Sequence, residues 1–75
     1  MEVIAYVQVY GVTLNICWQE YYAKQHPNGY FQAPESVLSK LTWPQRKELE
    51  LYQEILDKHG VDYTIAALEA LREQA

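Results

Sequence analysis

The clearest hydrophobic pattern in the chain lies in residues 42–60, where apolar side chains recur at steps of three and four. This spacing is that of one face of an α-helix. The face that we expect to pack on a core carries Leu49, Tyr52, Ile55, Leu56 and His59. The opposite face, which we expect to meet solvent, carries Arg46, Glu50, Gln53, Glu54 and Asp57. The pattern therefore predicts a long helix against which the rest of the chain packs.

Both ends of this helix carry recognisable signals. Thr42 and Gln45 have the spacing of a capping box, in which each side chain bonds to the other residue's backbone N–H. Pro44 falls in the first turn, where a missing N–H is tolerated. Gly60 can take the positive φ that often follows a last helical turn. We therefore expect the helix to run from Thr42 to His59.

The N-terminal region has the patterns of two strands. Residues 2–10 are rich in β-branched and aromatic side chains, and residues 12–18 alternate apolar with polar ones. Such runs are typical of a buried strand and a half-buried strand respectively. Tyr10 and Gly11 stand between them and predict a two-residue turn, although Asn or Asp would suit the position of Tyr10 better.

A helix is the alternative for part of this region. Leu14, Cys17, Trp18 and Tyr21 also match helical spacing, so a helix from about residue 15 to the residue before Pro27 is open. We favour a strand up to Trp18, because the many Val, Ile and Thr residues lose rotamer freedom in a helix.

The middle of the chain begins with the strongest turn signal in the sequence, His-Pro-Asn-Gly at residues 26–29. Residues 30–32 predict a short third strand, and residues 34–41 a short helix with Pro34 in its first turn. Pro44 disfavours helical dihedral angles at Trp43, which separates this helix from the long one.

A last helix is predicted over residues 62–74, capped by Asp62 or Thr64. Its apolar face of Ile, Leu and Ala lets it lie close to the long helix, which predicts an antiparallel helical hairpin. The predicted fold is α+β: an N-terminal β-hairpin, or three short strands, packed on this helical hairpin. An all-α small bundle is the alternative. Residues 1–75 form one small globular domain.

Composition and charge narrow the classes of function. The net charge is −4, which disfavours attraction to nucleic acid or anionic membranes. No run approaches the ~20 apolar residues that span a bilayer, and no positively charged segment precedes the first apolar run as in a signal peptide. The single cysteine, Cys17, excludes an internal disulfide and fits a reducing compartment. We expect a cytoplasmic protein.

Residues that could support catalysis or metal binding are few. Cys17, His26 and His59 match no known metal-ligand spacing, and a structural zinc site normally has four ligands. The acidic residues of the long helix alternate with basic ones, as on a solvated surface. No phosphate-binding loop or hydrolase motif occurs in the sequence. We expect no enzyme activity, no metal and no cofactor.

Aromatic residues are the most informative feature for function. Seven Tyr, two Trp and one Phe are more large rings than so small a domain can bury entirely. Exposed aromatic residues concentrate binding energy at protein interfaces. The candidate interface therefore contains Trp18, Tyr21, Tyr22, Tyr30 and Phe31. The alternative is that these rings fill a thin core.

The first strand is a second candidate contact. It carries Val3, Val7 and Val9 with no Lys, Arg or Pro, so an exposed edge would offer unpaired backbone groups to another chain. Together these features predict a non-catalytic protein-binding module, a small regulator or inhibitor that docks on a larger protein and self-associates. A homodimer paired through residues 2–10 is one form that this predicts.

A nucleic-acid-binding regulator is the alternative function. Lys40, Trp43, Arg46 and Lys47 form the one basic cluster, at a junction of two predicted helices that faintly resembles a helix-turn-helix. Three cations in an acidic protein are few for phosphate binding.

We therefore predict no appreciable binding to mixed DNA or RNA oligomers at low salt, because the chain has a net charge of −4. Fluorescence anisotropy measures this directly. Tight binding that Arg46→Glu abolishes would contradict the prediction and support the alternative function.

Overall fold

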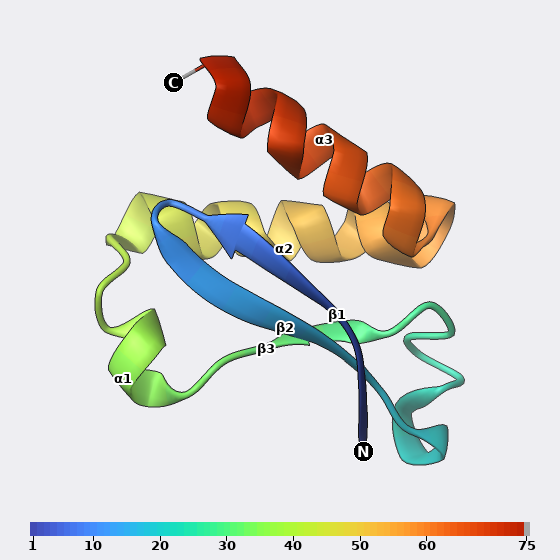
Figure 1. Cartoon of the computed structure of the whole chain (residues 1–75). Coiled ribbons are helices and arrows are strands. Elements are labelled where there is room, and N and C mark those ends of the chain that lie inside the picture. Colours follow the sequence, from blue (N-terminus) through green and yellow to red (C-terminus); the bar gives the residue numbers. More distant parts are fainter. Residues whose placement is uncertain (75) are drawn as a thin grey trace.

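The computed structural model describes the backbone of residues 1–74 and the side chains of residues 1–71 (Figure 1). Three strands form an antiparallel sheet in the order β1-β2-β3, and helices follow the last strand. The elements in chain order are β1 (Glu2–Val9), β2 (Val12–Trp18), the 3-10 helix η1 (Glu20–Tyr22), β3 (Tyr30–Gln32), α1 (Glu35–Leu38), α2 (Trp43–His59) and α3 (Val61–Gln74). The predicted α+β fold with a third short strand is confirmed, and the all-α alternative is wrong.

The β1–β2 hairpin turns through Tyr10 and Gly11, as predicted. Val9 pairs with Val12, and the two residues between them have φ of 54° and 79°. Positive φ at both central residues is the requirement of a type I′ turn, whose twist matches that of the flanking strands. A glycine adopts this conformation freely, whereas Tyr10 carries a Cβ atom that disfavours it.

The core lies between one face of the sheet and the two long helices. Its buried members come from four elements: Val7 and Val9, Leu14 and Ile16, Leu56, and Leu68. In Figure 1 the hairpin end of β1 and β2 lies in front of α2, and no helix crosses in front of the strands. The chain is thus a two-layer structure whose sheet has helices on one face only.

One irregularity interrupts the β1–β2 ladder. Val3 pairs with Cys17 and Ala5 with Ile16, so Ile4 is an extra residue in β1. A bulge of this kind bends a strand and increases its twist. The bulge lies in the N-terminal half of β1. Helix α3 packs against this strand and also against α2.

The start of α2 has the predicted capping box. Thr42 Oγ1 accepts from the Gln45 backbone N–H at 3.3 Å, and the Thr42 N–H donates to Gln45 Oε1 at 2.9 Å. At the other end, Gly60 has φ of 89° and its N–H donates to the Leu56 carbonyl. His59 is exposed rather than part of the core face, because it lies in the last turn, beyond the sheet-facing Leu56.

Two local predictions were wrong. Neither Asp62 nor Thr64 caps the last helix, because α3 begins at Val61 and both residues lie inside it. Thr64 is fully buried and donates its hydroxyl to the Gly60 carbonyl at 2.8 Å. The short helix over residues 34–41 is confined to α1, with Pro34 at its N-cap. The favoured strand up to Trp18 is confirmed, since these residues pair with β1. The alternative helix over residues 15–26 is not formed, and between β2 and β3 the described chain has only the short η1.

The described part of the chain contains no helix that is both long enough and apolar enough to cross a membrane.

Leu56 should be the largest single side-chain contribution from α2 to stability, because it is 0% exposed at the centre of the core. We predict that Leu56→Ala lowers the free energy of unfolding by about 2 to 5 kcal/mol. Leu51→Ala is the matched control, because Leu51 lies on the same helix and is 58% exposed; it should change stability by less than about 0.5 kcal/mol. Urea unfolding of both variants measures the difference, and equal losses would contradict this assignment of the core.

Candidate functional site

Aromatic rings gather where the chain passes from β2 to β3. The Tyr21 and Tyr22 rings meet edge to face with centroids 4.8 Å apart, and Tyr22 meets Tyr30 in the same manner at 5.5 Å. The His26 ring is tilted against Tyr30 at 6.2 Å. We call these four residues the aromatic surface. Tyr21 is 83% exposed, so this group of contacting rings reaches solvent.

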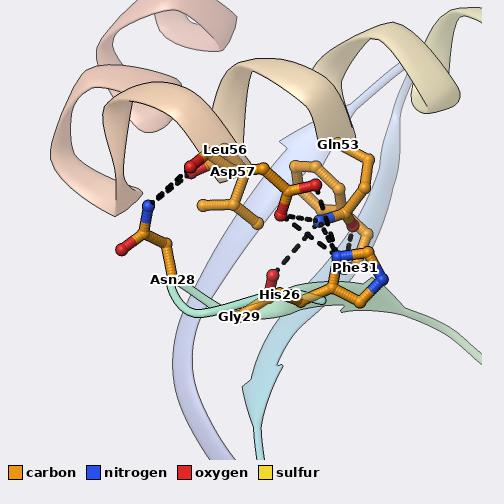
Figure 2. Close-up of polar contacts among 7 residues, drawn as sticks. All are labelled: His26, Asn28, Gly29, Phe31, Gln53, Leu56 and Asp57. Atoms are coloured by element: carbon orange, nitrogen blue, oxygen red, sulfur yellow. Dashed lines mark hydrogen bonds and ion pairs between the residues drawn. The ribbon is translucent and has the colours of Figure 1, made fainter. Parts of the chain in front are cut away.

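Gln53 of α2 joins this region to the helix. Its Oε1 accepts from the Phe31 N–H at 3.0 Å, and its Nε2 donates to the Gly29 carbonyl at 3.1 Å (Figure 2). A residue of a neighbouring strand would bond to the same two backbone groups, which flank Tyr30 on the outer edge of β3. The side-chain amide of Gln53 thus takes the place of a fourth strand at this point and satisfies that edge.

The second polar contact is between His26 and Asp57. His26 Nδ1 lies 3.1 Å from Asp57 Oδ1 and 3.3 Å from Oδ2, which assigns the ring proton to Nδ1. Gln53 Nε2 also donates to Asp57 Oδ1, at 3.0 Å. Both His26 and Asp57 are partly buried, where such a charge-assisted contact is less screened than at the open surface.

Asn28 and Gly29 complete the attachment of the turn. Asn28 Nδ2 donates to the Leu56 and Asp57 carbonyls at 3.0 and 3.1 Å. It adds a donor at the last turn of α2, where the Leu56 carbonyl also accepts from the Gly60 N–H. Gly29 has φ of 103°, and a Cβ atom there would lie 2.8 Å from the Cys17 carbonyl oxygen. Only glycine fits this close approach. The turn at residues 26–29 is therefore fixed by side chains on both sides.

A shallow cavity of about 360 Å³ opens beside these contacts. Rings of Tyr22, His26 and Tyr30 line it together with Phe31, and the side chains of Gln25 and Gln53 add amide groups. In Figure 2 the His26 ring directs Nδ1 at Asp57 and its other nitrogen away from it. The aromatic surface therefore combines ring faces with a few hydrogen-bonding groups, as protein-recognition sites do.

The sequence placed five aromatic residues and three valines in the candidate interface, and the structure separates them. Tyr21, Tyr22 and Tyr30 come together, whereas Trp18 is half-buried at the end of β2 and Phe31 packs against the core. Val3 is exposed, but Val7 and Val9 are core residues, 6% exposed. Their side chains cannot contact a partner, because they point to the helix-covered face of the sheet.

The basic cluster is partly used within the chain. The Arg46 guanidinium donates to the Leu38 carbonyl at 3.1 Å and lies 3.4 Å from a Glu35 oxygen. Lys47 Nζ lies 4.9 Å from the centre of the exposed Trp43 ring and 3.9 Å from Glu50. Arg46, Lys47 and Trp43 thus have partners of their own, while Lys40 is exposed.

The three residues considered for thiol or metal chemistry have separate environments. Cys17 is fully buried, its Sγ donates to Gln32 Oε1 at 3.2 Å, and burial raises the pKa of its thiol. The thiolate that a nucleophile requires is therefore disfavoured. His59 stacks on Tyr63 at 4.3 Å, whereas His26 bonds to Asp57. Among the side chains that the structure describes, no three His, Cys, Asp or Glu residues gather as metal ligands would.

Gln53 and Asp57 are the residues that sequence reasoning missed. Both were assigned to the solvent side of the long helix, but they contact β3 and the turn before it. Their spacing contained a signal: Gln53 lies four residues after Leu49, three before Leu56 and four before Asp57, and residues at these separations are neighbours on a helix surface. The assignment by polarity was wrong because these polar groups have partners in the turn rather than in water.

Comparison of the chain with protein-family models, curated proteins and solved structures finds no match.

Removing the Gln53 side chain should loosen the attachment of β3 to α2. We predict that Gln53→Ala lowers the free energy of unfolding by roughly 1 to 3 kcal/mol, because it leaves the Phe31 N–H and the Gly29 carbonyl without their partner. Hydrogen exchange at the Phe31 amide should accelerate in the same variant. Glu54→Ala, at the adjacent exposed position, is the control. Unchanged exchange at Phe31 would show that Gln53 does not hold this edge.

Proposed function

We propose that the chain is a non-catalytic protein-binding module, a small regulator or inhibitor that docks on a larger protein through the aromatic surface. One observation carries the proposal: an exposed tyrosine, Tyr21, meets Tyr22 edge to face, and Tyr22 meets Tyr30 in the same manner, beside a turn that polar contacts attach to α2. Tyrosine is among the residues that contribute most to protein interfaces. Rings held in place before binding lose little conformational freedom when a partner arrives.

The polar side chains beside the aromatic surface bond to one another, which supports a non-catalytic role. Both oxygens of Asp57 face His26, and one of them also accepts from Gln53. An acid–base pair needs a nucleophile or a reacting proton within hydrogen-bonding reach. The one cysteine is buried in the sheet. The His26–Asp57 pair is therefore better explained by its attachment of the turn to the helix.

Self-association through β1 is a second part of the proposal. β1 has one strand neighbour, and Val3, Ile4 and Tyr6 in its N-terminal half are exposed. Two copies paired antiparallel about this half would place their Glu2 residues at opposite ends, away from each other. Pairing along all of residues 2–10 has less support, because α3 packs against β1 and the bulge at Ile4 interrupts the edge.

The aromatic surface can be tested with a double variant, Tyr21→Ala with Tyr22→Ala. Affinity purification with the wild-type chain, followed by mass spectrometry, identifies the partner, and titration calorimetry then measures its affinity. We predict that the double variant weakens binding by about tenfold or more, because these rings are the proposed centre of the contact.

Tyr63→Ala is the matched control, because Tyr63 is another exposed, stacked tyrosine on a different element, α3. It should bind as the wild type does. Equal losses in the two variants, or none in either, would show that the partner docks elsewhere. Sedimentation of the same samples reports separately whether the chain self-associates.

A further inference from the structure

The hairpin turn contains the one residue other than glycine that has positive φ in the described part of the chain, Tyr10. Asn or Asp tolerates this conformation better than tyrosine and is preferred at this position of a type I′ turn. Residues kept in an unfavourable conformation are concentrated at functional sites, where the surrounding structure maintains them. The presence of a tyrosine here therefore calls for a role of its side chain other than turn formation.

Tyr10 lines a cavity at the hairpin end of the molecule. The cavity has a volume of about 300 Å³ and lies between the turn, α2 and α3. Tyr10 and Gly11 form one wall, Tyr52 another, and Leu68 and Leu71 a third. Figure 1 places this end of the sheet opposite the loop that carries η1. The cavity shares no lining residue with the hollow beside His26, so the two are separate sites.

The lining indicates the chemistry of an occupant. None of the described residues around the cavity is charged, and Gln8 is the one amide side chain among them. Tyr52 also remains neutral at physiological pH, because burial and the nearby Glu48 carboxylate raise the pKa of its phenol. A charged ligand would lose its hydration without gaining a partner, so the cavity favours a neutral one.

The volume indicates the size of the occupant. An apolar cavity of about 150 Å³ accepts a benzene molecule, and small-molecule sites begin at roughly 300 Å³. We propose that the cavity between the hairpin turn, α2 and α3 binds a neutral, ring-containing small molecule of one or two rings, with the Tyr10 side chain as one wall of the site.

Indole is a suitable probe, because it is neutral and has two rings. Titration of the full chain with indole, followed by ¹H–¹⁵N NMR, should give saturable shifts at the amides of Gly11, Leu68 and Leu71. Shifts that do not saturate, or that gather around Tyr21 and Tyr30, would overturn the proposal. So would cavity shifts that depend on protein concentration without indole, because a second copy would then occupy the cavity.

The Tyr10→Asn variant separates a binding role from a structural one. Asparagine accepts the left-handed conformation, so the melting temperature should rise or stay constant while indole affinity falls about tenfold with the loss of the ring. Tyr63→Ala, which changes an exposed tyrosine of α3 outside this cavity, should leave the affinity unchanged.

Two results from these variants would overturn the proposal. One is a lower melting temperature for Tyr10→Asn, which would make Tyr10 a stabilising residue of the fold. The other is unchanged indole affinity in Leu71→Ala, a variant that alters the same cavity without touching the turn.

Discussion

The burial of Leu56 between the sheet and α3 is the contact on which the other features depend. It fixes the distance and the rotation of α2 relative to Leu14 and Ile16 of β2, since all three belong to one core. Gln53 and Asp57 lie three residues before and one residue after Leu56. The rotation that buries the leucine therefore also directs these two polar side chains at the turn before β3. A helix rotated by one residue would lose both contacts together.

This coupling explains how a three-residue strand can be an ordered edge of the sheet. β3 has few ladder bonds of its own, and a short strand at an edge is weakly held. Gln53 bonds to its outer side, while Asn28 and His26 attach the preceding turn to the end of α2. The core thus holds the aromatic surface in place indirectly, because these polar contacts at the edge of the core connect α2 to the segment that carries the rings. The proposed docking role uses this support, because a rigid ring group loses less entropy on binding.

Most of the fold could be predicted from the sequence, but less of the candidate site could. The Tyr10-Gly11 turn depends on adjacent residues and the capping box of Thr42 on residues three apart, so both signals are local and can be recognised in the sequence. Gln53 and Asp57 have partners 22 to 31 residues away, and hydrophobic periodicity assigns polar residues to solvent whatever their partners. The same limit misplaced Val7 and Val9, because composition identifies an apolar strand but not which of its residues a helix covers.

The most direct test of this account is ¹⁵N NMR relaxation of the backbone across residues 19–31 in the free protein. The account predicts order parameters of about 0.85 for Tyr21, Tyr22 and Tyr30, equal to those of Leu14 and Ile16 in the core strand β2. Values below about 0.6 in this segment would contradict it. They would mean that the contacts from Gln53, Asp57 and Asn28 do not hold the aromatic surface in place before a partner binds.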